Sequence, residues 1–449
     1  MRLVKKMASG SVVVVVALIA YPLVASAASS LLRLSTDPFH NPRSQYQTEV
    51  EPDIASWGST LVGAFQVGRI ASGGSADIGW AASTDNGAHW SHGYLPGITT
   101  SEGGGPAFAA SDPAVAYDAA HHRWLIASLT LNNAGNGVDV SSSADGLSWA
   151  RPVVVTPPGS LDKTWISCDD SSSSPFFGRC YAEWDIAGIS DVVQMSTSAD
   201  GGKTWSTPAH PPGATGLGAE AVVQPNGTVI APFLADSGSI EAYRSTDGGK
   251  SWSSPVIIAR ASAHSDPGGL RAGPLPSVAI DGGGRVFVTW ESCLKATACS
   301  TNDAVLSTST NGTAWSTPIR VPVGAAGTSA DIVIPGIGVD RSTQGSSAHV
   351  GIVFYRFSNV NCTLATCRLS VGFISSLNGG GTWSAAAALG APMLLTWIAK
   401  SQNGRMVGDY FATAFAGGRA FPIFAVGTKP PAGQAFNEAM YTVQGGLKL

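Results

Sequence analysis

Short runs of alternating hydrophobic and polar residues extend along most of the chain, and they predict β-strands. Residues 240–244 and 255–258 are examples on either side of a Gly-rich turn. Such alternation places one face of a strand in a core and the other toward its surroundings. Residues 277–280 and 286–290 show the same pattern around a second turn. We therefore expect an all-β protein built from hairpins.

The pattern Ser-x-Asp-Gly-Gly-x-x-Trp recurs six times with small variations, most clearly at 198–205 and 245–252. The Trp residues of successive copies are 47 to 68 residues apart. Asp or Asn accepts hydrogen bonds from turn N–H groups, and Gly adopts the positive φ of a tight turn. We interpret the copies as structural hairpin tips, centred on Asp85, Asp145, Asp200, Asp247, Asn311 and Asn378.

Two hairpins in each repeat make a four-stranded antiparallel sheet, which is one blade of a β-propeller. Seven inner strands are predicted, although the octapeptide has only six copies. We predict that residues 30–35 supply the outer strand of the last blade and close the ring. This favours seven blades, with six as the alternative. The predicted inner strands begin near Glu51, Asp112, Trp165, Glu220, Leu275, Asp331 and Asp409.

Only 12% of the 449 residues are charged, about half the share in an ordinary soluble protein. A basic start and the apolar run 12–20, followed by the small residues 25–28, are typical of a secretory signal peptide. We predict a signal peptide over 1–27 and one propeller domain over 28–449. Without 1–27, 26 − 3 = 23 basic residues stand against 30 acidic ones, a net charge of −7. We therefore expect a secreted monomer that binds neither nucleic acid nor, after cleavage, a membrane.

Six cysteines follow the predicted cleavage site, in a chain exported to an oxidising compartment. Fifteen connectivities are open to six cysteines, and the simplest joins close neighbours in sequence. The spacings do not match a zinc finger or ribbon, and no His cluster accompanies them, so we expect no zinc site. The predicted pairs are Cys168 with Cys180, Cys293 with Cys299, and Cys362 with Cys367.

Acidic residues gather at the predicted starts of the inner strands, which surround the channel on one face of a propeller. One interpretation is a catalytic carboxylate pair or a divalent cation site, for example for calcium. The other is a set of carboxylates that accept hydrogen bonds from neighbouring loop N–H groups. The residues of this rim are Glu51, Asp112, Asp162, Glu220, Asp331 and Asp409.

The octapeptides resemble the Asp-box, or BNR repeat, of the sialidase-like superfamily, and the similarity runs from about residue 45 to 430. The resemblance implies a β-propeller with its Asp-boxes on the face away from the active site. Sialidases use an acid/base Asp, a Glu that activates a Tyr nucleophile, and three Arg that bind the substrate carboxylate. Segments 73–78, 220–227 and 409–412 look like the segments that carry the first three, so the resemblance implies Asp77, Glu220 and Tyr410 as catalytic residues.

One motif departs from the sialidase pattern. Sialidases carry Arg-Ile-Pro on the first inner strand, where this chain has Val50-Glu51-Pro52. A carboxylate there would repel sialic acid by about 1 kcal/mol in water and by several when desolvated. Arg271, Arg341 and Arg405 are the remaining candidate cations. The chain therefore looks closer to uncharacterised secreted relatives than to true sialidases.

We expect a glycoside hydrolase that acts on a neutral or amino sugar of an extracellular glycan. The alternative is a non-catalytic propeller that binds glycan or protein through the same rim. The catalytic hypothesis requires Glu220 and Tyr410 within hydrogen-bond reach, on the same face as Asp77. Trp57, Trp165 and Trp290 would stack on sugars in either case. The expected substrate-binding residues are Glu51, Asp112, Asp162, Trp165, Arg271 and Asp409.

Overall fold

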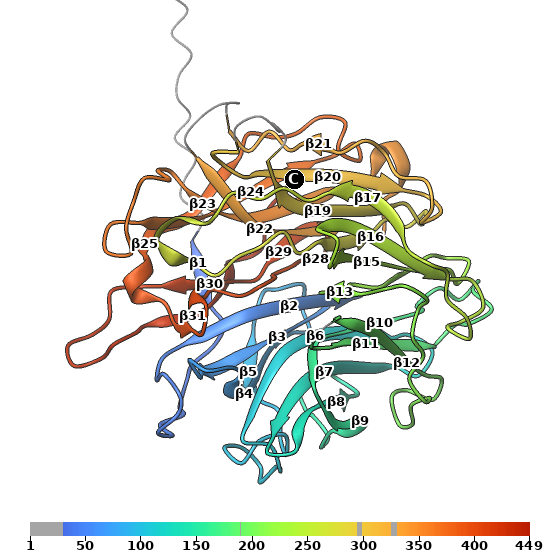
Figure 1. Cartoon of the computed structure of the whole chain (residues 1–449), viewed down its shortest axis with the longest axis horizontal. Helices are drawn as coiled ribbons and strands as arrows, with labels where there is room; N and C mark the ends of the chain where they lie inside the picture. Colours follow the sequence, from blue (N-terminus) through green and yellow to red (C-terminus); the bar gives the residue numbers. More distant parts are fainter. Residues whose placement is uncertain (1–29, 189, 294–298, 325–329) are drawn as a thin grey trace, which may run out of the picture.

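The computed structural model describes residues 30–449 except 189, 294–298 and 325–329, and β-strands dominate it (Figure 1). The predicted signal peptide lies outside the described residues. The named strands pair antiparallel, which confirms the expected all-β class and is consistent with a β-propeller. The helical elements within the described ranges are three short 3-10 turns, η1 (Pro267–Gly269), η2 (Gly345–Ser347) and η3 (Leu395–Trp397).

The strands form sheets in chain order, each a meander joined by hairpins. The first two sheets are linked by a single bridge between Ser75 and Ala110. The first holds β2 (Glu49–Trp57), β3 (Thr60–Arg69), β4 (Ser75–Ser83) and β5 (Ser91–Tyr94). The second holds β6 (Ala109–Asp118), β7 (Arg123–Asn132), β8 (Gly135–Ser143) and β9 (Val153–Gly159). The third holds β10 (Leu161–Cys168), β11 (Cys180–Ile186) and β12 (Val192–Ser198).

The middle of the chain repeats this plan, and two small hairpin strands, β26 (Lys400–Ser401) and β27 (Gly404–Arg405), follow it. The fourth sheet holds β13 (Gly216–Leu217), β14 (Val222–Val223), β15 (Val229–Ala235), β16 (Ser239–Ser245) and β17 (Val256–Arg260). The fifth holds β18 (Ser277–Ile280), β19 (Val286–Ser292), β20 (Asp303–Ser309) and β21 (Ile319–Arg320). The sixth holds β22 (Asp331–Val339), β23 (Val350–Phe357), β24 (Arg368–Ser376) and β25 (Ala387–Leu394).

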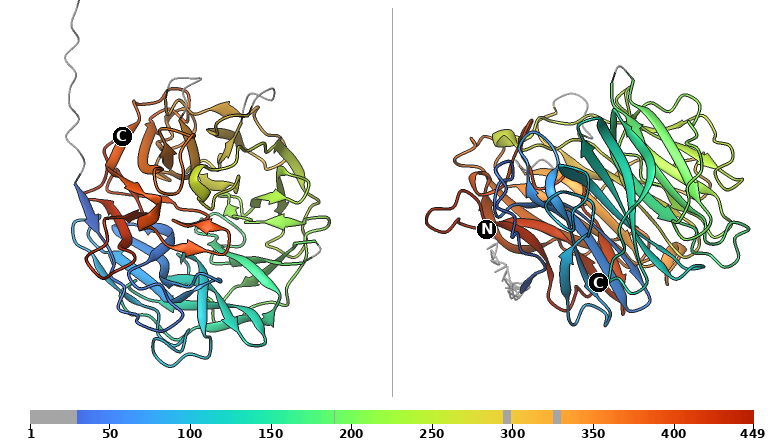
Figure 2. Two further views of the ribbon diagram at one scale, coloured as in Figure 1. Left: turned by 60° about the vertical axis from the view of Figure 1, so that its left-hand side comes forward. Right: turned by 90° about the horizontal axis from the view of Figure 1, so that it is seen from below.

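Strands from both ends of the described chain meet in one sheet. β1 (Leu31–Arg33) pairs with β31 (Glu438–Val443), which pairs with β30 (Phe424–Gly427). β28 (Thr413–Ala416) and β29 (Arg419–Pro422) lie beside them, and β2 packs against β28, β30 and β31. The sheets are arranged around a common centre, with the blue and red ends of the chain side by side (Figure 2). This pairing of β1 is what the ring-closure prediction requires.

The six octapeptides adopt one turn geometry. In each copy the Ser hydroxyl donates to the Asp or Asn side chain two residues later, over 2.8–3.3 Å. A Gly N–H donates to the same Ser hydroxyl, as at Gly202 (3.0 Å). Each turn follows the third strand of its sheet, which runs parallel to the innermost strand. The octapeptides therefore lie on the face where the inner strands end.

We predict that Asp200→Ala lowers the free energy of unfolding by about 1–2 kcal/mol, because it removes a local cap of this kind. Asp200 accepts hydrogen bonds from the N–H groups of Lys203 and Thr204 (both 3.0 Å) and from the Thr204 hydroxyl (2.6 Å). Urea unfolding measures the change. Asp200→Asn is the matched control and should cost much less, because Asn311 and Asn378 occupy the same position in other copies. Equal losses in both variants would contradict this account.

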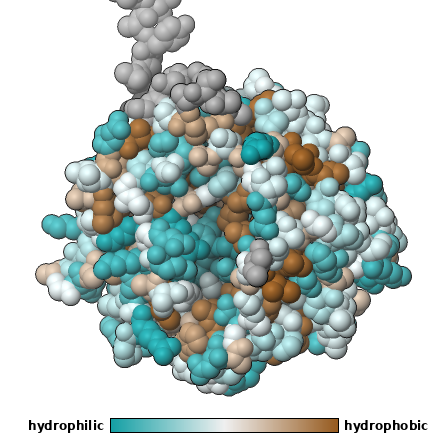
Figure 3. Space-filling view, viewed as in Figure 1, coloured by the Kyte–Doolittle hydropathy of each residue, from teal (hydrophilic) through white to brown (hydrophobic). Residues whose placement is uncertain are grey.

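The three predicted disulfides are present: Cys168–Cys180, Cys293–Cys299 and Cys362–Cys367. Disulfides fit an oxidising compartment. Over the described ranges no helix is long and apolar enough to cross a membrane. The face in Figure 3 is mostly pale or hydrophilic, with hydrophobic residues in small separate groups.

Candidate functional site: a charged cluster and a central cavity

Four inner strands begin with the same backbone irregularity. β2, β6, β10 and β22 each change register near their start, and each has a residue with positive φ there: Glu51 (61°), Asp112 (48°), Lys163 (51°) and the apolar Ile334 (49°). Positive φ is strained for a residue other than Gly, and such strain concentrates at functional sites. A bulge also redirects the side chain at that point of the strand. The three charged residues therefore occupy equivalent bulges in three consecutive sheets.

These bulges contribute to a group of ionisable side chains, which we call the charged cluster: Glu51, Asp112, Asp162, Lys163, Arg271 and Asp409. The Lys163 ammonium group donates to the Asp409 carboxylate and lies 3.8 Å from Glu51. Arg271 binds the same carboxylate with two nitrogens, one of them at 2.8 Å. Asp409 is thus held between two cations. The cluster contains all the charged residues expected for substrate binding: Glu51, Asp112, Asp162, Arg271 and Asp409.

The backbone and neighbouring polar groups hold the cluster in place. The Lys163 N–H donates to both Asp112 and Asp162 (3.0 Å each). The Gln66 side chain donates to Glu51 and to the Ser111 hydroxyl (3.0 Å). Arg69 donates to Gln66 (2.8 Å) from the other side. The cluster is therefore rigid and largely buried, with Asp162 and Arg271 its partly exposed members.

The carboxyls of the cluster have different pKa values, because their surroundings shift these values in opposite directions. Burial, followed by the Asp112 charge, raises the pKa of Glu51 to about 8. Burial, again followed by Asp112, raises the pKa of Asp162 to about 6. Burial acts in the same direction on Asp409, but Lys163 and Arg271 outweigh it and hold its pKa below the ordinary value. Near neutral pH the cluster thus contains both a protonated and an ionised carboxyl, which is an arrangement that acid–base catalysis uses.

Asp185 on β11 lies next to this cluster, opposite Asp162 in the register of the sheet. Its two carboxylate oxygens are buried and have no hydrogen-bond partner among the described residues. Burial, followed by the Asp162 charge, raises the pKa of Asp185 to about 9. Sequence analysis missed Asp185, because it sits in a second strand and in no recognisable motif.

Glu220 and Tyr410 line one small cavity beside Lys163, but they share no hydrogen bond in the described structure, and Asp77 does not line that cavity. The Tyr410 hydroxyl donates to the Pro113 carbonyl (2.9 Å), and burial raises its pKa well above the usual range. Glu220 accepts a hydrogen bond from the Val278 N–H (2.8 Å). Asp77 is on β4, the third strand of its sheet, where it accepts from the Ile78 N–H (2.8 Å). The expected contact between Glu220 and Tyr410 is replaced by these backbone contacts, and the three catalytic assignments stay predictions.

Other buried acids join neighbouring sheets, as the hydrogen-bonding interpretation of the rim anticipated. Asp53 accepts from the Val115 N–H (2.7 Å), and Glu183 from the Ala221 N–H (2.9 Å). Asp331, a predicted rim residue, lies outside the charged cluster and contacts His264 (3.4 Å). Within the described ranges no three His, Cys, Asp or Glu side chains are arranged to hold a metal ion.

A separate cavity of about 860 Å³ occupies the centre of the molecule. The later halves of the inner strands line it, from Asp53, Trp165 and Glu220 to the hairpins at the strand ends. No member of the charged cluster lines it. Trp165 lies between the two features, with its ring edge-on to Tyr410 (5.2 Å between centroids). The molecule thus has a charged cluster where the inner strands begin and a cavity along their remaining length.

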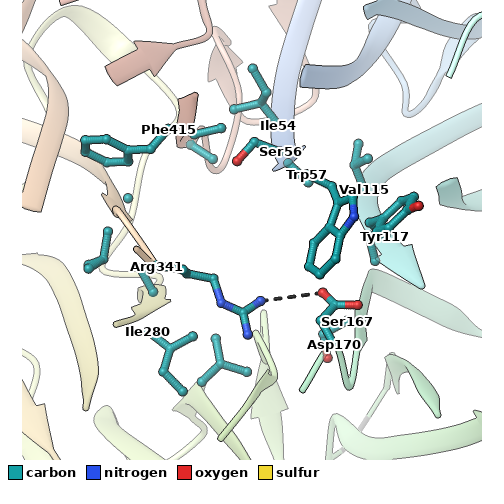
Figure 4. Close-up of a pocket in the computed structure, with 18 of the residues that line it drawn as sticks. Ile54, Ser56, Trp57, Val115, Tyr117, Ser167, Asp170, Ile280, Arg341 and Phe415 are labelled. Carbon is teal, nitrogen blue, oxygen red and sulfur yellow. Dashed lines mark hydrogen bonds and ion pairs between the residues drawn. The ribbon is translucent and has the colours of Figure 1, made fainter. Parts of the chain in front are cut away.

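At the far end of the cavity, Arg341 and Asp170 face each other across the space, 3.5 Å apart (Figure 4). Trp57 lies beside them, stacked on Tyr117 (5.0 Å, 26°). Of the three Trp residues predicted to stack on sugars, Trp57 and Trp165 line the cavity. Trp290 is only 1% exposed and packs in the core, so its prediction is wrong. Its place in a second strand, between two sheets, explains the burial.

No protein-family model matches the chain, and no curated protein sequence matches it. Solved structures do match. An ulvan lyase, a polysaccharide lyase, has a TM-score of 0.50 and 12% identity over 93% of this chain and 96% of its own. An α-L-arabinofuranosidase from Fusarium graminearum has a TM-score of 0.47 and 11% identity over 93% and 98%. The Hadza microbial sialidase Hz136 has a TM-score of 0.44 and 15% identity over 84% of this chain and 63% of its own.

The chain spans less than two thirds of the length of that sialidase. At these identities the matches concern the fold. The match to the ulvan lyase shows a similar overall fold and nothing beyond the fold.

Proposed function

We propose that this chain is a secreted glycoside hydrolase with a single seven-bladed propeller domain that β1 closes. The sheets supply seven inner strand segments around the cavity, and β1 completes the sheet of β30 and β31, beside which β28 and β29 lie. The proteins of similar fold named above act on glycans, according to their printed names: they are a polysaccharide lyase, a sialidase and an arabinofuranosidase. The proposed reaction centre is the charged cluster.

The observation that carries this proposal is the set of carboxyls whose pKa values are moved apart within one cluster. A glycosidase needs one carboxyl to protonate the leaving oxygen and a second one that stays ionised. We assign the first role to Asp162, which is partly exposed and has a pKa raised to about 6. Asp409 is the ionised partner: it accepts a proton from the water that attacks the anomeric carbon, while Asp162 gives its proton to the departing oxygen. Arg271, which is partly exposed, binds the Asp409 carboxylate and lies at the edge of the proposed centre.

The charge balance favours a neutral or amino sugar. Lys163 and Arg271 are the cations nearest to the reaction centre, and both already bind Asp409. A substrate carboxylate would have to displace Asp409 from them and would meet the negative charge of the other acids. An uncharged hydroxyl or an ammonium group meets no such barrier.

We expect Asp162→Asn to lower kcat at least about 100-fold, because removal of a general acid has an effect of that size. The assay is hydrolysis of a panel of aryl glycosides and polysaccharides by the purified mature protein. Asp303→Asn is the matched control, since Asp303 pairs with Arg320 (2.6 Å) outside the cluster. Loss of activity in Asp77→Asn, Glu220→Gln and Tyr410→Phe, with Asp162→Asn unaffected, would instead place the reaction at the residues that the sialidase resemblance implied.

The second candidate function is non-catalytic binding of an extracellular glycan. The charged groups of the cluster already pair with one another, and this favours the binding function. Lys163 is 9% exposed, and Asp409 is held by two cations. Binding of a polysaccharide without turnover in the same panel would select this candidate.

A further inference from the structure

The far end of the central cavity is separate from the proposed reaction centre. Residues of the charged cluster are absent from its lining, which is built from the inner strands and the hairpins that follow them. This end of the cavity lies on the face of the octapeptide turns. Asn86, in the first of these turns, donates its N–H to the carbonyl of Ser59 (2.9 Å), two residues after Trp57 at the end of β2. This end is therefore open to a ligand of its own.

Trp57 is the main apolar feature of this end. It is the last residue of β2 and is 41% exposed, which is unusual for a residue type that is mostly buried. Tyr117 stacks against one face of the indole ring and is itself packed on Trp124 (4.8 Å). The ring is thus fixed in orientation while it stays accessible from the cavity (Figure 4). A fixed aromatic face beside polar groups suits a ligand with both apolar and hydrogen-bonding surfaces.

Arg341 and Asp170 supply the polar groups. Asp170 also accepts a hydrogen bond from the Ala119 N–H (3.1 Å), so its carboxylate is anchored. The Arg341 side chain is 46% exposed, and its one hydrogen bond among the described residues is to Asp170, at 3.5 Å. The pair is long and its Arg341 end is exposed, so the guanidinium can turn toward a ligand, while Asp170, only 10% exposed, stays in place. The Arg341 guanidinium then offers several donors and the Asp170 carboxylate an acceptor, and together the two groups carry no net charge.

The rest of the lining narrows the class of ligand. Ile54, Val115 and Ile280 alternate around the walls with the hydroxyls of Ser56 and Ser167 (Figure 4). An anionic ligand would have to compete with Asp170 for Arg341, and an acyl chain would leave the ion pair and the hydroxyls unused. A neutral sugar has apolar C–H faces for Trp57 and hydroxyls for the ion pair. The volume of about 860 Å³ falls within the range of ligand-binding pockets.

We propose that this end of the cavity binds a short neutral oligosaccharide through Trp57, Arg341 and Asp170, as a second site that takes no part in the reaction. The site is defined independently of the charged cluster. It would hold a glycan chain on the face opposite the reaction centre.

Isothermal titration calorimetry with cellotriose, maltotriose, xylotriose and chitotriose tests the proposal, with oleate and a trigalacturonate as the apolar and anionic probes. We expect at least one neutral trisaccharide to bind with a Kd below about 1 mM. Trp57→Ala should weaken this binding at least about tenfold, as removal of an aromatic anchor does. Arg341→Gln should weaken it as well. Thermal melting shows that each variant is folded.

Two controls separate this site from the reaction centre. Phe177 is 39% exposed, close to the value for Trp57, but does not line the cavity, so Phe177→Ala should bind normally. Asp162→Asn should also bind normally, whether or not it retains hydrolytic activity. The proposal is overturned if none of the four trisaccharides binds, if oleate or trigalacturonate binds in their place, or if folded Trp57→Ala retains full affinity.

Discussion

Lys163→Met is expected to lower the free energy of unfolding by about 3–5 kcal/mol, the range found when one partner of a buried ion pair is removed. The ammonium group binds Asp409 and lies 3.8 Å from Glu51, so its loss leaves buried acids facing one another. The acids in turn stabilise the charged form of Lys163. Burial opposes the Lys163 charge, but Asp409 and its acidic neighbours raise the pKa of Lys163 above its ordinary value. The midpoint of urea unfolding at neutral pH measures the loss.

Two further variants test this explanation. Lys250→Met alters an exposed lysine in an octapeptide turn and should leave the midpoint nearly unchanged. Lys163→Met combined with Asp409→Asn should recover part of the loss, because replacing both partners of a buried pair costs less than breaking it. An additive double variant, or a single variant as stable as the original protein, would show that the cluster is not coupled in this way.

The second large effect is on pH: the protein should be more stable near pH 5 than near pH 8.5. Burial raises the pKa of Glu49 and of Glu51 to about 8, and that of Asp185 to about 9. Their folded forms hold protons that the unfolded chain releases near pH 4, so their contribution is complete below that pH and is lost as the pH rises through 8 to 9. Asp409 acts oppositely, because its lowered pKa gives stability above about pH 4 that is lost in stronger acid. The optimum therefore lies in mild acid.

As the pH rises, each of these acids lowers the free energy of unfolding by up to about 1.4 kcal/mol per pH unit. We therefore expect the free energy of unfolding to differ by several kcal/mol between pH 5 and pH 8.5. Unfolding midpoints at constant ionic strength measure it. Asp185→Asn should make the curve shallower, since it removes a carboxyl that has no partner in the described structure. Asp303→Asn, in a partly exposed ion pair, should not change its slope. Stability that rises steadily from pH 5 to 8.5 would contradict the prediction.

Much of the fold could be predicted because local patterns determine it. The hairpin expected at 277–280 and 286–290 is β18 and β19, and the strand expected at 30–35 contains β1. Each rests on alternation or on turn residues, which act within a few positions of the chain. The disulfides could be predicted for the same reason, because each closes a short loop.

The site was predictable only in part. Glu51, Asp112, Asp162, Arg271 and Asp409 do come together, because the starts of inner strands meet around one axis. Lys163 was missed, because its role depends on a bulge that aligns it with Glu51 and Asp112, and a bulge leaves no pattern in the sequence. Asp77, Glu220 and Tyr410 were chosen by resemblance, and their hydrogen bonds to nearby backbone groups depend on how neighbouring segments pack.

The pairing of β1 with β31 has a consequence for synthesis on the ribosome. The first described strand leaves the ribosome early, yet its partner is among the last residues to appear. The sheet of β1, β31 and β30 can therefore form only at the end of synthesis, and β1 stays unpaired until then. An unpaired strand edge invites pairing with other chains. The six octapeptide hairpins need no such distant partner, so their sheets can form in order while the chain grows, and the last pairing joins the two ends.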